Sequence, residues 1–342
     1  MTLETPATAE LAKPVAAWHH TNLFELRLSL RVRVWLRIAR FLTAARIYAS
    51  MERIPNVPAA KRKATRPPGW MTLPLPPGVE IVDRTPEELG VPVATRTYAP
   101  ARPDGPLPIV VFTHGGGFVN GGLDAMQFFC AQLAVAARML VVSVDYPLAP
   151  ESEFPEALEA SYAVLRWAAV NGADLGGDPG HLFVAGDSAG GNLAAALCLL
   201  ARKLEFPRVD KQVLIYPTLD ATQSSPRLRA ETPARRRERF IYYGYYAGDT
   251  DPGDELLSPL LAESVERLPD ALIVTAEQDA LRDDGILYAQ RLRAAGVHVR
   301  FTNYLGMPHG FLSMPRLCRS ATSQAILEIA TALQESLESD GS

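Results

Sequence analysis

Cysteine and net charge are both scarce in this 342-residue chain, and each scarcity excludes a class of protein. Its three cysteines, Cys130, Cys198 and Cys318, are too few and too scattered for a disulfide framework or a zinc site. Lys and Arg number 34 against 38 Asp and Glu, so the net charge of −4 lacks the basic excess that binds nucleic acid. We therefore expect a protein of the reducing cytoplasm with no metal and no nucleic-acid partner.

Long hydrophobic runs are missing as well. No run approaches the roughly 18 apolar residues that a membrane span needs, and the longest candidate, 133–144, is interrupted by Arg138. The first twenty residues lack the apolar centre of a secretory signal. With 48% hydrophobic and 21% charged residues, the composition is globular, and the length favours one large α/β domain with an appendage.

Positive charge is concentrated in residues 23–66, which hold eleven Lys or Arg and only two Glu. Part of this stretch alternates apolar and polar residues as a strand does, but the absence of Gly and Pro from 15–54 favours an amphipathic helix. Such a helix can lie on an anionic membrane. We favour packing of its apolar face on the rest of the protein. Seven prolines in 55–78 then predict a linker.

From residue 79 onward, short β-branched runs alternate with helical stretches and turns. Most runs are continuously apolar, which is typical of strands in a parallel sheet with helices on both faces. The first two are expected to form an antiparallel edge. The predicted strands are 79–83, 91–98, 109–113, 140–145, 182–185, 213–216, 272–275 and 297–304, and the clearest helices are 189–204, 282–295 and 320–337. Gly296 stands where the second helix needs its C-terminal cap.

One serine stands between a predicted strand and a predicted helix, with glycine two residues before and two after it. Gly186, Ser188 and Gly190 form a G-x-S-x-G elbow in its strand-turn-helix context. A side chain at 186 or 190 would collide with a neighbouring element, and the helix dipole at Ser188 favours developing negative charge. Ser188 is the predicted nucleophile, and the competing interpretation is a Gly-rich turn with an incidental serine.

A serine hydroxyl needs a base, and the base needs an orienting acid. His309 lies in the loop after the last predicted strand, and Asp279 directly follows the strand before it, both at the edge where sites of open α/β sheets gather. Individually, a solvated histidine and a helix N-cap are ordinary interpretations. The chain order Ser188, Asp279, His309 is the α/β-hydrolase order. Asp283 and Glu277 are competing candidates for the acid.

Three glycines follow the predicted strand 109–113, in the run from Thr113 to Phe118. Glycine amides can approach a substrate oxygen closely, and the amide of Ala189 is a further donor for a developing oxyanion. A phosphate-binding loop is the rival interpretation, but no Lys and Ser/Thr follow the glycines as a P-loop requires. We expect no cofactor.

Together these motifs resemble the hormone-sensitive lipase family of α/β-hydrolases, the bacterial family IV esterases and lipases. The resemblance implies the α/β-hydrolase fold, a mostly parallel central sheet with helices on both faces and a helical cap. It also implies that Ser188 is the nucleophile, His309 the general base and then acid, and Asp279 the residue that orients it. The motifs are HGGGF at 114–118, DY at 145–146, LAPE at 148–151, GDSAGG at 186–191, EQDALRD at 277–283 and HGF at 309–311.

The resemblance maps the oxyanion hole to Gly116, Gly117 and Ala189, with Gly115 a further candidate. Candidates for substrate contact border these loops: Phe118, Asp187, Tyr146 and Phe311. Family members usually carry Arg after the Asp-Tyr pair, whereas this chain has Pro147, so the hydrogen bonds that this Arg makes near Glu151 must be absent or replaced.

The implied cap would combine the N-terminal segment with an insertion after Tyr216-Pro217. The aromatics of 240–246 can line an acyl or alcohol pocket, beside a solvated arginine run at 235–239. The predicted domains are an N-terminal cap segment and linker (1–75), the first part of the catalytic core (76–218), the cap insertion (219–257) and the second part of the core (258–342).

The predicted function is a cofactor-independent serine carboxylesterase that hydrolyses small-molecule esters of short to medium acyl chains through an acyl-enzyme, as a monomer or homodimer. An amidase or lactonase would use the same residues. A ligand receptor on a hydrolase fold and a membrane-surface lipid hydrolase using the basic helix are rival functions of different classes. The plant gibberellin receptors, which resemble this family, lack the catalytic histidine, whereas His309 is present here.

Overall fold

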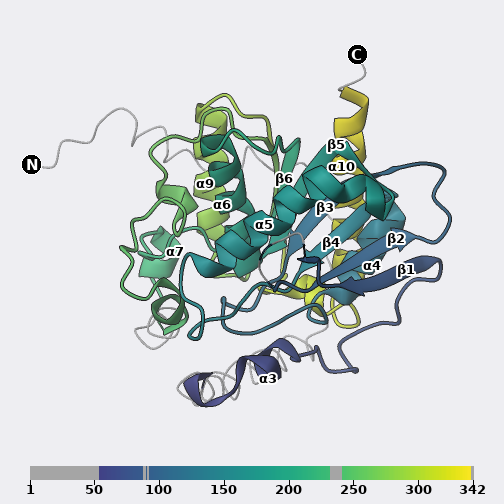
Figure 1. The fold of residues 1–342 in the computed structure, drawn as a ribbon. Coiled ribbons are helices and arrows are strands. Elements are labelled where there is room, and N and C mark those ends of the chain that lie inside the picture. Colours follow the sequence, from purple (N-terminus) through teal and green to yellow (C-terminus); the bar gives the residue numbers. More distant parts are fainter. Residues whose placement is uncertain (1–53, 88–89, 91, 232–240, 340–342) are drawn as a thin grey trace, which may run out of the picture.

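A computed structural model describes residues 54–87, 90, 92–231 and 241–339 (Figure 1). The predicted N-terminal helix, for which we favour packing on the protein over contact with a membrane, and the arginine run at 235–239 lie outside these residues. Within the described ranges, no helix is both long and apolar enough to cross a bilayer.

An eight-stranded sheet forms the centre of the described chain, in the order β1-β2-β4-β3-β5-β6-β7-β8. β2 pairs antiparallel with β1 and with β4, and the other pairs are parallel. The mostly parallel sheet with an antiparallel edge is therefore confirmed. The strands are β1 (Val79–Arg84), β2 (Thr95–Pro100), β3 (Leu107–Thr113), β4 (Leu140–Val144), β5 (Gly177–Asp187), β6 (Lys211–Ile215), β7 (Asp270–Ala276) and β8 (Val299–Tyr304).

Helices cover both faces of this sheet (Figure 1). Residues of α5, α6 and α9 belong to one hydrophobic core, and residues of α4 and α10 to the other. β3 contributes Ile109 and Val111 to the first core and Val110 and Phe112 to the second, the alternation of a strand buried on both sides. The helices are α3 (Ala59–Lys63), α4 (Gln127–Ala137), α5 (Glu156–Asn171), α6 (Ala189–Lys203), α7 (Pro226–Arg229), α9 (Arg282–Ala294) and α10 (Arg319–Ser339), with short 3₁₀ turns η2 (Ile54–Asn56), η4 (Gly172–Leu175), η5 (Pro259–Leu261) and η6 (Phe311–Ser313). Residues 241–247 are helical as well.

The end of α9 confirms the predicted glycine cap and explains why β8 starts later than predicted. Gly296 has a φ of 81°. Its amide donates to the carbonyl of Arg293, and the amide of Val297 donates to the carbonyl of Leu292, both at 3.0 Å. Because Val297 closes the helix, regular strand pairing begins only at Val299.

The second strand also starts later than predicted, at Thr95 rather than residue 91. Pro92 has no amide hydrogen to donate into a ladder, so it is a poor strand residue beside a paired neighbour. The ladder of β2 with β1 runs from Thr95 to Pro100.

The proline-rich segment 55–78, predicted as a linker, packs on the core and contains the short helix α3. The side chain of Arg62 in this helix is buried. Farther along, the amide of Arg316 donates to the carbonyl of Met71 at 3.0 Å and its guanidinium to that of Thr72. The segment is thus a fixed part of the fold, because its contacts are made by buried or hydrogen-bonded groups along its length.

A buried carboxyl in the first turn of α9 gives a prediction for stability against pH. Oδ2 of Asp284 accepts the amide of Leu219 at 3.1 Å, and burial raises the pKa of Asp284 to about 7. The folded protein holds this proton more tightly than the unfolded chain, whose Asp titrates near about 4. This group therefore lowers the free energy of unfolding as the pH rises from about 4 through about 7.

We expect Asp284→Asn to reduce the fall in Tm between about pH 5 and about pH 8 by several degrees, because the amide side chain keeps an acceptor for Leu219 without becoming charged. Calorimetric Tm at both pH values, for wild type and variant, measures this. A variant whose Tm falls as much as that of the wild type would contradict it.

Candidate active site

Ser188 stands at the turn between β5 and α6. Its backbone has a φ of 55° and a ψ of −115°, which is strained for a residue with a side chain. Its amide donates to the carbonyl of Ile215 at 2.9 Å. A Cβ on Gly186 would lie 2.2 Å from the carbonyl oxygen of Gly190, and one on Gly190 would lie 1.9 Å from that of Thr113. The collisions predicted for side chains at 186 and 190 are therefore confirmed.

The serine, the loop histidine and the aspartate that follows β7 form a hydrogen-bonded chain. Oγ of Ser188 is 2.9 Å from Nε2 of His309, and Nδ1 of His309 is 2.6 Å from Oδ2 of Asp279. The Asp279 side chain is 3% exposed and that of His309 40%. Oδ1 of Asp279 accepts the amide of Leu281 at 3.0 Å, which fixes the carboxylate. In this arrangement the imidazole can accept the serine proton while the carboxylate sets its tautomer.

The two competing candidates for the acid are engaged elsewhere. Oε2 of Glu277 accepts the amide of Gly306 at 2.7 Å and so anchors the loop that carries His309. Oδ2 of Asp283 accepts the amide of Arg227 at 3.1 Å. Among the three carboxylates, Asp279 is the one in contact with the histidine.

The glycine run after β3 presents backbone amides next to Ser188. The amide of Gly115 donates to Oδ1 of Asp187 at 2.7 Å, which removes it from the candidates for the oxyanion hole in this structure. No described residue accepts a hydrogen bond from the amides of Gly116, Gly117 or Ala189. These three amides are therefore available to a substrate oxygen.

Asp187 ties this loop to the nucleophile elbow rather than facing an open pocket. Its side chain is buried, and a Cβ on Gly115 would lie 2.6 Å from its Oδ2. Burial raises the pKa of Asp187 to about 6, although the hydrogen bond from Gly115 favours the ionised form. The sequence predicts substrate contact for Asp187, whereas the structure shows its carboxylate bound to the amide of Gly115.

The three aromatic residues predicted to contact substrate are buried and contact protein. The hydroxyl of Tyr146 donates to the carbonyl of His114 at 2.6 Å, and the two rings stack with centroids 4.2 Å apart. The ring of Phe118 stacks on that of Tyr246, with centroids 3.9 Å apart. Phe311 is enclosed in the second core. In this structure they hold the catalytic loops in place, because almost none of their surface is accessible.

Residues 241–247 of the predicted cap insertion are helical and pack on the glycine loop. The hydroxyl of Tyr243 pairs with Oγ1 of Thr218 at 2.7 Å, and the carbonyl of Tyr246 accepts the amide of Phe154 at 2.6 Å. A Cβ on Gly117 would lie 2.9 Å from the ring of Tyr242. The aromatic run was visible in the sequence, but not which of its rings lies against the loop.

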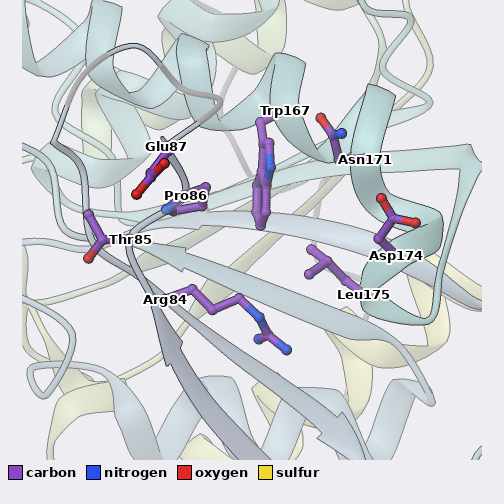
Figure 2. Close-up of a pocket in the computed structure, with 8 residues that line it drawn as sticks. All are labelled: Arg84, Thr85, Pro86, Glu87, Trp167, Asn171, Asp174 and Leu175. Carbon is purple, nitrogen blue, oxygen red and sulfur yellow. The ribbon is translucent and has the colours of Figure 1, made fainter.

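Two cavities lie in the described part of the chain away from the residues of the triad. A shallow cavity of about 460 Å³ lies between the end of β1 and α5, with Trp167 and Arg84 facing each other across it (Figure 2). A second, of about 360 Å³, lies between the 66–75 segment and the start of α4. No group of three or more potential metal ligands is present among the described residues.

This chain is similar in sequence to a known protein family and to named proteins. The family described as alpha/beta hydrolase fold matches residues 110–313. Carboxylesterase NlhH of Mycobacterium tuberculosis is 41% identical over 228 residues, 65% of this chain and 72% of its own length. Esterase LipI of the same species is 40% identical over 256 residues, 73% of this chain and 80% of its own.

Solved structures agree with these relatives. An alpha/beta hydrolase enzyme from the metagenome of Lake Arreo superposes with a TM-score of 0.78 at 33% identity, over 88% of this chain and 97% of that one. The esterase rPPE, in a mutant complexed with (S)-Ac-CPA, superposes with a TM-score of 0.77 at 31% identity, over 86% and 96%.

Proposed function

This chain belongs to the hormone-sensitive lipase family of α/β-hydrolases, and from that premise we propose that it hydrolyses short to medium acyl esters with Ser188 as its nucleophile. It is a carboxylic-ester hydrolase, and its relatives are named carboxylesterase, esterase and carboxylic ester hydrolase. The observation that carries the assignment of residues is the hydrogen-bonded chain from Ser188 through His309 to Asp279.

The first half of the proposed reaction forms the acyl-enzyme. Oγ of Ser188 attacks the ester carbonyl carbon while Nε2 of His309 takes its proton. The carbonyl oxygen becomes an oxyanion, which accepts hydrogen bonds from the free amides of Gly116, Gly117 and Ala189. The intermediate then expels the alcohol: the bond from carbon to the alkoxy oxygen breaks, and the imidazolium gives its proton to that oxygen.

The second half returns the free enzyme. Water attacks the acyl carbon, and His309 now takes a proton from the water. The same amides bind the second oxyanion. The bond between the acyl carbon and Oγ breaks, Ser188 recovers its proton from His309, and the carboxylic acid leaves. The side chain of Asp279 holds the imidazole in one orientation throughout.

A panel of p-nitrophenyl esters from acetate to octanoate, with Ser188→Ala as the blank, tests this function and its acyl range. An anilide and a lactone in the same assay test for amidase and lactonase activity. We expect turnover of the acetate, butyrate and hexanoate, and little of the anilide. Turnover of an anilide faster than of every ester would contradict the proposed substrate class.

We propose that 219–257 forms the cap and that Tyr242 limits the acyl chain. Its ring lies against Gly117, beside the position proposed for the substrate carbonyl. Removing the ring opens space for further methylenes, each worth about 0.8 kcal/mol when buried. Tyr242→Ala should raise the ratio of kcat/KM for octanoate over acetate by about three- to tenfold.

The matched control for this prediction is Tyr242→Phe, which keeps the ring and removes only the hydroxyl. It should keep the wild-type ratio. An alanine variant with the wild-type ratio would show that Tyr242 does not set the acyl preference.

We also propose a cytoplasmic enzyme that is a monomer or homodimer. The free, buried thiols of Cys130, Cys198 and Cys318 support a reducing compartment. Light scattering coupled to size-exclusion chromatography determines the number of chains, and a tetramer or larger assembly would contradict this proposal.

A further inference from the structure

The loop that carries the glycine amides is held from outside by a buried arginine in α3. We propose that Arg62 is a positioning residue for ester hydrolysis: it fixes the segment 117–121 and thereby orients the amides that bind the oxyanion. The inference rests on the proposed function, because it assigns these amides to the oxyanion hole. Arg62 also takes the place, beside Glu151, of the arginine that the family resemblance led us to expect at Pro147.

The guanidinium of Arg62 is enclosed by acceptors. Its Nη1 donates to the carbonyls of Val119 and Ala149, the latter at 2.6 Å. Nε donates to the carbonyl of Val57 at 2.8 Å, and Nη2 pairs with the carboxylate of Glu151. The side chain is 3% exposed. A planar fork with several donors can satisfy acceptors in these different directions, whereas a single ammonium group cannot.

The backbone around Arg62 adds contacts at the far end of the same loop. The amide of Gly121 donates to the carbonyl of Arg62 at 3.1 Å. A Cβ on Gly122 would lie 2.6 Å from the carbonyl oxygen of Lys63, so these two backbone segments are in close contact. Nζ of Lys63 is 2.8 Å from Oδ2 of Asp145. α3 is therefore joined to the loop after β3 and to the residue that follows β4.

The loop is one that needs such support. Gly116, Gly117, Phe118 and Gly121 have φ values of 136°, 64°, 65° and 93°. For Phe118, which has a side chain, this conformation costs on the order of 1–3 kcal/mol and persists only when its surroundings impose it. Tyr246, in the helix at 241–247, stacks on Phe118 on one side of the loop. On the other side, Arg62 binds the carbonyl of the next residue, Val119.

A short path leads from the guanidinium to the oxyanion donor. Arg62 fixes the carbonyl of Val119. The amides of Val119 and Asn120 both donate to the carbonyl of Gly116, at 3.3 and 3.0 Å. That carbonyl shares one planar peptide unit with the N–H of Gly117, so holding one fixes the direction of the other. Loss of Arg62 thus releases the peptide whose N–H is proposed to meet the oxyanion.

The same guanidinium bridges this loop to the run Leu148–Glu151. The amide of Ala149 donates to the carbonyl of Phe118 at 3.0 Å, while the carbonyl of Ala149 accepts from Arg62. Glu151, which Pro147 leaves without a neighbouring arginine in the motif, is paired by Arg62 from a position 89 residues earlier. An arginine from α3 therefore supplies the pairing near Glu151.

The test uses the full-length chain with Arg62→Gln, the more conservative Arg62→Lys, and Lys61→Gln as a matched control that removes an exposed charge from the adjacent position. For each, kcat and KM on p-nitrophenyl butyrate are measured. We also measure the inhibition constants of a trifluoromethyl ketone and of the corresponding secondary alcohol. The serine adds to the ketone carbonyl and so forms an oxyanion, whereas the alcohol has no carbonyl and forms none. Unfolding is followed in parallel.

We expect Arg62→Gln to lower kcat by about tenfold to a hundredfold, because a misdirected oxyanion donor costs up to about 10²- to 10³-fold when lost outright. KM should change by less than about threefold, since the lost interaction is made only in the transition state. The inhibition constant of the ketone should rise by the same factor by which kcat falls, while that of the alcohol should not change. Arg62→Lys should lie between Gln and wild type, and Lys61→Gln should match wild type.

Wild-type kcat in a folded Arg62→Gln protein overturns the inference. So does equal weakening of the ketone and the alcohol, which would indicate general disruption of the site. If Arg62→Gln does not fold, Arg62→Lys decides by the same comparison of the two inhibitors. Wild-type protein that hydrolyses no ester would refute the proposed function, an outcome distinct from either of these.

Discussion

Ser188→Ala is expected to lower kcat for ester hydrolysis by about 10⁴- to 10⁶-fold without unfolding the protein, because members of a catalytic triad act as one unit. Alanine can occupy the backbone position of Ser188, and its N–H can still donate the hydrogen bond to the carbonyl of Ile215. The remaining activity would come from the oxyanion amides and substrate binding alone. Steady-state rates on p-nitrophenyl butyrate measure the loss, and a melting curve verifies the fold.

An exposed serine gives the control for this variant. Oγ of Ser264 accepts a hydrogen bond from the amide of Glu266 in the same loop, so Ser264→Ala should retain wild-type kcat. A Ser188→Ala enzyme with more than about a tenth of wild-type turnover would remove the serine mechanism.

Asp279→Asn should lower kcat by about 10³- to 10⁴-fold while KM stays near the wild-type value. The asparagine keeps the shape of the contact, but its amide can donate to Nδ1 of His309, and the histidine then presents the wrong tautomer to Ser188. The loss lies in kcat because the base, not the binding of the ester, is affected.

Asp283→Asn is the matched control for this variant. Asp283 lies four residues along the chain, and its carboxylate accepts the amide of Arg227 rather than facing the histidine. It should retain most of wild-type kcat. The opposite ranking, with Asp283→Asn inactive and Asp279→Asn active, would reassign the orienting acid.

The elbow could be predicted from sequence because each close backbone approach at this turn requires a glycine at a fixed distance from the serine. A side chain at Gly186 would meet the carbonyl of Gly190, and one at Gly190 would meet the carbonyl of Thr113 at the end of β3. Whichever element makes the contact, the requirement for glycine leaves a spacing pattern in the sequence. The sheet was predictable for a similar reason: strands buried on both faces are continuously apolar whichever neighbours they pair with. The predicted start of β8 was wrong because Val297 belongs to the end of the preceding helix: its amide donates to the carbonyl of Leu292 in α9.

The contacts of long side chains outside the serine motif left no comparable pattern. In the sequence, Arg62 is one more charge in a basic, proline-rich segment, and only the folded chain brings it to Val119 and Glu151. Tyr242 was one aromatic among several, and its approach to Gly117 depends on how the helix at 241–247 packs. The absence of an arginine at 147 indicated that its hydrogen bonds near Glu151 are absent or replaced, but not which residue replaces them.

The most direct test of the central claim is the mass of the enzyme quenched during turnover of a slowly deacylated p-nitrophenyl ester. The proposed mechanism predicts one acyl group per chain, mapped to Ser188 by peptide analysis and absent from Ser188→Ala. An acyl group on any other residue, or turnover with no covalent intermediate on Ser188 under conditions where a burst of p-nitrophenol is seen, would contradict it.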